Sequence, residues 1–416
     1  MSQVAELRKE GYEHARELLR QCVTDDGFLA STVERDNYRR IWARDGVIIG
    51  LAALMTGIDS LVETMRRTLK TLAQHQGPHG EIPSNVDTIA HRISYGGTTG
   101  RVDADLWFVI GCGEYWLATG DDAFLDEMLP VLERVRFLLG AWEFNDRGLI
   151  YVPQTGDWAD EYVQSGYILY DQLLYLQALR AFCRIHHHVH GSADHQLEDR
   201  TMRMLHVIRS NYWFNGSDPE DVYHEVLYQK GRKAAPHRAS RYWMPFFSPT
   251  GYGYRFDAFA NVLAGLFNVA EGDQAEQVDR YIREVTPRSL SLLPAFHPVI
   301  EPIDRDWESL QVMFSYSFKN NPYEFHNGGL WPMITGFYVA DLVRRGHTVK
   351  ARRYLDGIHQ ANALPMSDEP WAFPEFVHGK KLTAGGNRCQ GWSAAAAVMA
   401  HHALDDQLLF RLTSND

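Results

Sequence analysis

The chain has 416 residues, of which 45% are hydrophobic and 12% aromatic, so it can bury a large core. Its formal net charge of −12 argues against a nucleic-acid partner, which would favour a basic face. No apolar run approaches the ~18–20 residues of a membrane span, and residues 1–23 lack the apolar core of a signal peptide, so we expect no membrane partner.

Cysteine usage points to a reducing compartment. Cys22, Cys112, Cys183 and Cys389 are widely spaced and form no CxxC pair. This pattern is typical of reduced thiols in a cytoplasmic protein. We find no HExxH motif, no Cys/His pairing and no phosphate-binding loop, and so predict neither a metal nor a cofactor. The sequence leaves open whether the chain forms a homo-oligomer.

Helical periodicity dominates the chain, in about twelve segments whose ends are uncertain by ~2–4 residues. They lie near residues 2–22, 44–56, 59–76, 103–119, 122–141, 170–188, 193–212, 256–270, 273–285, 328–345, 347–363 and 391–404. A short β-like run covers residues 149–152, and the connections 142–169, 213–255, 286–327 and 364–390 are long. Loops this long are usually functional, and 213–255 suits a lid or a wall of a binding site.

The helical segments alternate in character. Segments 59–76 and 122–141 carry one apolar stripe, as surface helices do, whereas 103–119 and 391–404 are apolar on nearly every side, as buried helices are. Segments 256–270 and 328–345 also belong to the second type. Six inner helices ringed by six outer ones would give this alternation, and no linker divides the chain. We therefore predict an all-α fold, an (α/α)6 barrel, as a single domain over residues 1–416.

Unusual polar residues precede each expected inner helix. In a barrel of this kind every inner helix begins at the same end, so these residues should meet in one pocket. Each alone could be a helix cap or a buried ion pair, but six such groups together indicate a site. The groups are Arg44 and Asp45; Arg101, Asp103 and Asp105; Asp157 and Asp160; Arg255 and Asp257; His326 and Asn327; and Glu375, Gln390 and Trp392.

The densest group is the run from Gly156 to Glu161, which places three carboxylates around Trp158. A carboxyl group beside an indole is well placed for a raised pKa, and a carboxylic acid protonated near neutral pH can act as a general acid. Our candidate is Asp160. The alternative is that these acids cap a helix and face water.

A site that cleaves sugars would give these residues clear roles. Two carboxylates on opposite sides of the scissile bond supply acid and base. Arg44 and Asp45 can hold two hydroxyls, one as donor and one as acceptor. Trp158, Trp331 and Trp392 can pack on the faces of sugar rings.

Several segments resemble the alkaline/neutral invertases, glycoside hydrolase family 100, over about residues 37–403. The most specific is His326-Asn327-Gly328-Gly329 followed by Trp331-Pro332, which matches that family's His-Asn-Gly-Gly-Ser-Trp-Pro. The other matching segments are Asn37-Tyr38 with Arg44-Asp45, Val102-Asp103 with Leu106-Trp107, Arg255-Phe256-Asp257, Pro374-Glu375-Phe376, and Gln390 with Trp392-Ser393. Weaker similarity links Trp158-Ala159-Asp160 to glycogen-debranching glucosidase domains, and Trp42 with Arg44-Asp45 to glucoamylases.

The resemblance implies an (α/α)6 barrel that hydrolyses sucrose, with the general acid at Asp160 and the second catalytic carboxylate at Glu375. Where the family has Arg after the acid, this chain has Glu161, and Phe376-Val377-His378 lacks the acidic residue that follows the family's second motif. An α-glucosidase on another glucoside, such as an α-1,6-glucan or glucosylglycerate, therefore stays open. The residues implied for substrate binding are Tyr38, Trp42, Arg44, Asp45, Arg101, Asp103, Trp107, Asp157, Trp158, Arg255, Asp257, His326, Asn327, Trp331, Gln390 and Trp392.

Three further points remain predictions. The two carboxyl groups should lie roughly 6.5–9.5 Å apart, the spacing of enzymes that invert the anomeric carbon. Asp157 or Asp103 could replace Asp160 as the acid. A sugar 2-epimerase with paired histidines, or a sugar-binding barrel without catalysis, could also present this pocket.

Overall fold

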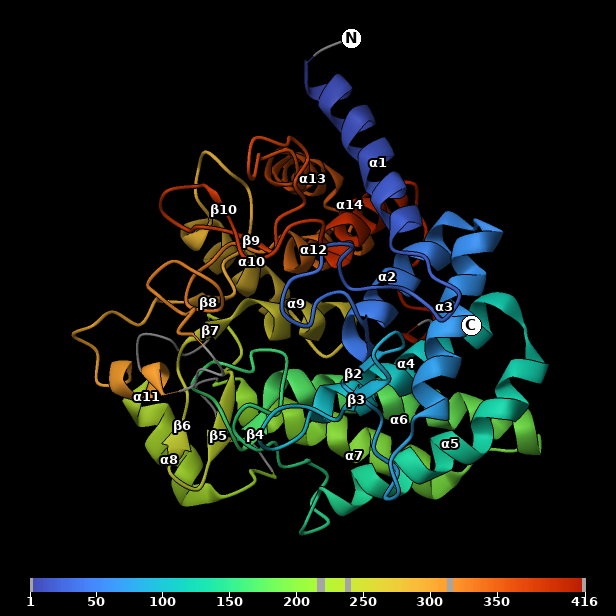
Figure 1. The fold of residues 1–416 in the computed structure, drawn as a ribbon. Coiled ribbons are helices and arrows are strands. Elements are labelled where there is room, and N and C mark those ends of the chain that lie inside the picture. The colour runs from blue at the N-terminus through green and yellow to red at the C-terminus, as the bar shows by residue number, and fades with distance from the viewer. Residues whose placement is uncertain (1–2, 215–220, 236–240, 313–316, 414–416) are drawn as a thin grey trace.

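Six helices form a closed inner ring in the computed structural model, which describes residues 3–214, 221–235, 241–312 and 317–413 (Figure 1). Each of these helices contacts the next along the chain, and the last returns to contact the first. The ring consists of α2 (Ala43–Thr56), α4 (Val102–Thr119), α6 (Leu169–His190), α9 (Ala258–Leu266), α12 (Pro332–Arg344) and α14 (Gly391–Leu404).

Six outer helices cover the ring, each packed on an inner helix. They are α1 (Gln3–Gln21) on α14, α3 (Asp59–Gln74) on α2, α5 (Asp122–Ala141) on α4, α7 (His195–Tyr212) on α6, α10 (Gln274–Val285) on α9, and α13 (Thr348–Asn362) on α12. The predicted all-α fold is confirmed. The sequence did not predict α8 (Glu225–Ala234) and α11 (Trp307–Gln311), which lie inside the long connections.

Short antiparallel strands organise the connections. They are β1 (Ile41–Trp42), β2 (Asn85–Asp87), β3 (Arg92–Ser94), β4 (Tyr167–Ile168), β5 (Phe246–Ser248), β6 (Gly251–Tyr252), β7 (Phe256–Asp257), β8 (Phe296–His297), β9 (Phe376–Val377) and β10 (Ala384–Gly385). The sheets run β1-β2-β3, β4-β5-β6, β7-β8 and β9-β10. Because β1, β4 and β7 end where α2, α6 and α9 begin, these sheets fix the starts of three inner helices. The run 149–152 forms only one bridge, Val152 with Gly166.

Burial explains which helices are inner and which are outer. Every residue from Val102 to Trp116 in α4 is buried, whereas α10 buries one face that includes Val278, Tyr281 and Ile282. Among the described residues, no helix combines the length and the apolar character that crossing a bilayer would need. The 3-10 turn Arg411–Thr413 packs on α4 and α6, where the buried Glu114 accepts backbone N–H groups at 2.8 and 3.0 Å.

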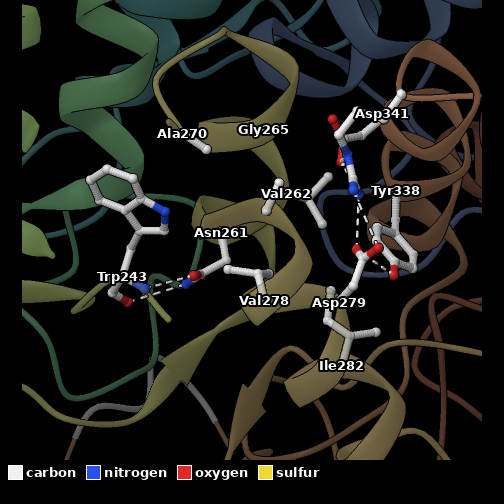
Figure 2. Close-up of a pocket in the computed structure, with 12 residues that line it drawn as sticks. Trp243, Asn261, Val262, Gly265, Ala270, Val278, Asp279, Ile282, Tyr338 and Asp341 are labelled. Atoms are coloured by element: carbon white, nitrogen blue, oxygen red, sulfur yellow. Dashed lines mark hydrogen bonds and ion pairs between the residues drawn. The ribbon is translucent and has the colours of Figure 1, made fainter. Parts of the chain in front are cut away.

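A buried ion-pair network fastens α10 to α12 beside a small pocket (Figure 2). Arg345 donates to Asp279 at 2.8 Å and to Asp341 at 2.9 Å. Tyr338 donates to the same Asp279 at 2.9 Å. Both carboxylates are buried, so each depends on its partners for the hydrogen bonds that water would otherwise supply.

Removing Arg345 should destabilise the fold. Arg345→Met leaves two buried carboxylates short of a partner, and we expect a loss of about 3 kcal/mol, the lower end of the usual range, because Lys350 still reaches Asp279. Urea denaturation, which gives the free energy of unfolding, measures this loss of stability. Arg280→Met is the control: this exposed arginine of α10 lies 3.9 Å from Asp273, and its loss should change stability by under ~0.5 kcal/mol. Equal effects of the two substitutions would contradict the prediction.

A histidine pair joins α13 to α14 under α1. His359 Nε2 and His401 Nε2 lie 2.8 Å apart, and burial lowers the pKa of His359 to about 3 and that of His401 to about 4. Both rings stay neutral in the folded protein at pH values where the unfolded chain binds protons. Gly11 permits this packing, since a Cβ there would lie 2.1 Å from His359 Nδ1.

Stability should therefore fall with acidification. The contribution of the pair is complete above the unfolded pKa of ~6.5 and is lost progressively as the pH falls towards 4. We expect the urea midpoint to drop over this window, and to drop less in a His359→Gln variant, which keeps a polar partner for His401. The same slope in both proteins would show that other groups cause the acid sensitivity.

Candidate active site

The starts of three inner helices meet at Arg44. Its Nη1 lies 2.7 Å from Asp103 Oδ2, which links α2 to α4. Its guanidinium carbon lies 5.7 Å from the ring centroid of Trp392, at the start of α14. Asp45, next in the chain, is also buried, and burial raises its pKa to about 6. Three of the six predicted helix-start groups, those of α2, α4 and α14, therefore lie together at Arg44.

Arg101 ties the acidic loop to the start of α4. Its Nη1 donates to the backbone oxygen of Asp157 at 2.8 Å, and its Nη2 forms an ion pair with Asp160. The backbone N–H of Val102 donates to Gly156 oxygen at 2.8 Å. The loop that follows residue 155 is therefore held at the same end of the barrel as Arg44.

Glu375 lies in the loop before α14 and is contacted from the loop before β1. Tyr38 donates to its Oε1 at 2.8 Å and the backbone N–H of Asn387 to its Oε2 at 3.0 Å. The residue is 3% exposed. Burial raises the pKa of Glu375 to about 7, although both hydrogen bonds act in the opposite direction. Glu375 can therefore exchange a proton near neutral pH.

The raised pKa expected for Asp160 is wrong for this structure. Burial raises the pKa of Asp160, but the charge of Arg101, then that of His326 and the hydrogen bond from Arg101, hold it below its usual value. In the free protein Asp160 is therefore ionised near neutral pH. The sequence showed the indole beside Asp160 but not the arginine that reaches it from 59 residues away.

Exposure separates Asp160 from the two other acids considered. The Asp160 side chain is 29% exposed, whereas Asp157 and Asp103 are each 1% exposed. Gln164 donates to Asp157, and burial together with the charges of Asp103 and Asp257 raises the pKa of Asp157. Of these three carboxylates, Asp160 is the one placed to meet a ligand.

The predicted tryptophans pack together in the interior. The Trp158 ring centroid lies 5.4 Å from that of Trp331, and Trp331 lies 5.5 Å from Trp392. His326 stacks on Trp331 at 5.4 Å. All four side chains are buried, so their faces already pack on other rings. The expectation that Trp158, Trp331 and Trp392 pack on sugar rings is therefore corrected for this structure.

Trp107 and Trp42 differ in how far they are buried. Trp107 is buried and donates from Nε1 to Tyr170 at 2.7 Å. Trp42 is half-buried, and its Nε1 donates to the backbone of Asn37 at 2.9 Å. Of the two, only Trp42 keeps part of its surface free for a ligand.

Three other predicted residues make hydrogen bonds or ion pairs that stabilise the loops and the helix start around them. Arg255 lies 2.5 Å from Asp306, Asp257 caps α9 by accepting from Ala260 at 3.1 Å, and Asn327 donates to Ile300 at 2.9 Å. Gln390 differs: it is fully buried, and neither atom of its amide has a hydrogen-bond partner in the part of the chain that the structure describes.

Lys319 and Tyr170 were not predicted. Lys319 is 35% exposed, lies 3.7 Å from Glu161, and acts by its charge on Glu375 and His326. No helix start lies near it, so sequence patterns did not single it out. Tyr170 donates to Asp103 at 3.3 Å from the first turn of α6, where the same helix-start rule would have found it.

Metal ligands are not grouped in the described residues, where no three His, Cys, Asp or Glu side chains could hold an ion together. The four cysteines are unpaired.

Comparison with known proteins agrees with the motifs. Residues 222–407 match the family model described as alkaline and neutral invertase. A probable alkaline/neutral invertase D of Arabidopsis thaliana is 25% identical over 430 residues, which covers 90% of this chain and 77% of the relative. Other relatives include a cytosolic and a chloroplastic invertase of rice. The resemblance predicted from the motifs is confirmed.

Solved structures share the fold. A mannosylglycerate hydrolase of family GH63 from Thermus thermophilus has a TM-score of 0.62 at 13% identity, covering 93% of this chain and 99% of that one. A bacterial glucoamylase has a TM-score of 0.63 at 12% identity, covering 97% of this chain. This chain spans 57% of the glucoamylase.

Proposed function

We propose that this protein is an inverting glycoside hydrolase that cleaves sucrose into glucose and fructose, with Asp160 as general acid and Glu375 as general base. Similarity to invertases over 90% of the chain supports the hydrolase class and the substrate. One observation supports the pair. Tyr38 donates to Glu375 at 2.8 Å, and its hydroxyl also interacts with the charge of Asp160: burial, then the charge of Glu375, then their hydrogen bond, then the charge of Asp160 raise its pKa.

The proposed mechanism uses the two acids from opposite loops. Asp160 protonates the glycosidic oxygen, and Glu375, held by Tyr38 and Asn387, takes a proton from the attacking water. Arg44 and Asp45 hold hydroxyls of the glucosyl ring. With a water between base and sugar, the anomeric carbon inverts, so α-glucosides release β-glucose first.

Leaving-group chemistry tests the two roles. Asp160→Asn should lower sucrose hydrolysis by on the order of 10²–10⁴-fold, because the fructosyl oxygen leaves only when protonated. The same variant should keep most of its activity on α-glucosyl fluoride, whose fluoride leaves with little assistance. Glu375→Gln should lose activity on both substrates, since each needs an activated water. Rates of glucose release measure both effects.

The control for these variants is Asp157→Asn, which alters a buried neighbour of the same loop. If Glu375→Gln keeps activity on the fluoride and Asp160→Asn does not, the two roles are reversed. If Asp157→Asn behaves as predicted for Asp160→Asn, the acid is Asp157.

A second candidate substrate is an α-glucoside with an anionic leaving group, such as glucosylglycerate. Lys319 favours it, because a partly exposed ammonium group acts on both Glu375 and His326 at the pocket. A carboxylate on the leaving group would add a charge-assisted hydrogen bond there. Sucrose remains the first choice because the invertase similarity covers most of the chain.

A substrate panel decides between them. We expect glucose release from sucrose to exceed that from maltose, isomaltose, trehalose and glucosylglycerate, with β-glucose appearing first in ¹H NMR spectra. Preferential cleavage of glucosylglycerate, lost in Lys319→Met, would establish the second candidate. Interconversion of free sugars without glucoside cleavage would indicate an epimerase, and binding without turnover would indicate a non-catalytic barrel.

We also propose a cytoplasmic location, supported by four unpaired cysteines and by a cytosolic relative.

A further inference from the structure

The ionised state of Asp160 in the free protein has an identifiable source. Arg101, from the start of α4, forms an ion pair with Asp160. The other titratable groups that interact with the charge of Asp160 are Arg44 from α2, His326 from the loop before α12, and Tyr38 from the loop before β1. The four groups divide into two cations and two side chains that are neutral near pH 7. The group that keeps Asp160 ionised is therefore one of the two arginines.

His326 cannot supply a positive charge at neutral pH. It is buried beneath Trp331, and burial lowers its pKa to about 3 against the opposing pull of Asp160. Tyr38 is uncharged as well, since burial and nearby carboxylates raise its pKa well above the usual value. Near neutral pH neither side chain is positively charged; His326 adds to the lowering of the Asp160 pKa only where it is itself protonated, at low pH.

Arg44 is already committed elsewhere. Its Nη1 lies 2.7 Å from Asp103, and its Nε lies 3.8 Å from Asp45. Arg101 has one carboxylate partner, Asp160, and it makes the direct hydrogen bond. Arg101 is therefore the arginine whose positive charge acts most directly on Asp160.

Arg101 is also held rigidly. Its other terminal nitrogen donates to the Asp157 backbone at 2.8 Å, and a Cβ at Gly96 would lie 2.8 Å from its Cγ, so the stem packs against backbone. Gly96, at φ 116°, and Gly100, at φ 85°, both occupy the left-handed region that favours glycine. The buried Nε of Arg101 has no hydrogen-bond partner among the described residues.

We propose that Arg101 is a positioning residue that keeps Asp160 in place and ionised in the free protein, so that Asp160 takes up its proton only when a bound sugar competes for the guanidinium. This inference rests on the proposed function and deepens it. It predicts that Arg101 sets the pH window of the acid without itself touching the reacting atoms.

The first test needs no turnover. Carbodiimides react with protonated carboxyl groups, so the pH dependence of Asp160 labelling in the ligand-free protein, followed by peptide mass spectrometry, reports its ionisation. Arg101→Met should move the midpoint of labelling about 1–3 pH units higher, the usual effect of losing an arginine partner. Arg101→Lys should restore most of the wild-type behaviour.

Arg40→Met is the matched control. Arg40 is a partly buried arginine near the same loops, which donates to Asn85 at 3.1 Å and lies 3.5 Å from Asp87. The Arg40→Met substitution should leave the labelling midpoint of Asp160 unchanged. An unchanged midpoint in Arg101→Met would overturn the proposal, whatever the substrate of the protein.

The second test uses the pH profile of kcat/KM on sucrose. Because the lower of the two macroscopic pKa values should belong to Asp160, the limb at low pH should move to higher pH in Arg101→Met. A purely structural role would lower activity at every pH and leave the limbs in place, which would contradict the proposal. If the wild-type protein cleaves no glucoside, the proposed function fails, but the labelling experiment still decides the role of Arg101.

Discussion

Close approach of the inner helices is the constraint on which the site depends. A Cβ at Gly336 of α12 would lie 2.7 Å from Ala396 Cα in α14, and a Cβ at Gly111 of α4 would lie 2.7 Å from Val47 in α2. Small residues at these contacts let six helices close into a ring. Since each outer helix returns the chain to the same end, closure brings six helix starts together. The grouping of the site residues is thus a consequence of topology, and these residues can be far apart in sequence.

Charge at the helix starts follows from the same geometry. The positive end of each helix dipole favours a carboxylate in the first turn, as with Asp45 in α2 and Asp103 in α4. Several such acids in one buried space raise each other's pKa, and arginines must offset the cost. Arg44 does so for Asp103 and Arg101 for Asp160. Each arginine therefore pairs with a buried or partly buried acid, and the charge of Arg101 lowers the pKa of Asp160.

Sequence patterns predicted most of the fold because helical periodicity is local. Twelve helices and the convergence of their starts followed from it. The short helices α8 and α11 and strands of two or three residues carry too little pattern to detect. The site was harder for a physical reason: whether Trp158 faces a ligand or other rings, and which arginine reaches Asp160, are tertiary facts. The role of Lys319 depends likewise on a contact with Glu161 across 158 residues of chain.

The relative pKa values of Asp160 and Glu375 determine how substrate binding must change their protonation. In the mechanism that we propose, the productive form carries a proton on Asp160 and none on Glu375, whereas the charges of the free protein favour the reverse. A bound sugar acts on the two acids unequally, since Asp160 is 29% exposed and Glu375 only 3%. A bound sugar that excludes water therefore desolvates Asp160 far more than Glu375 and raises the pKa of Asp160. Glu375 is already almost fully shielded from water, so its pKa changes little. Because the same sugar hydroxyls compete for Arg101, substrate binding itself moves the pair towards the order that hydrolysis requires.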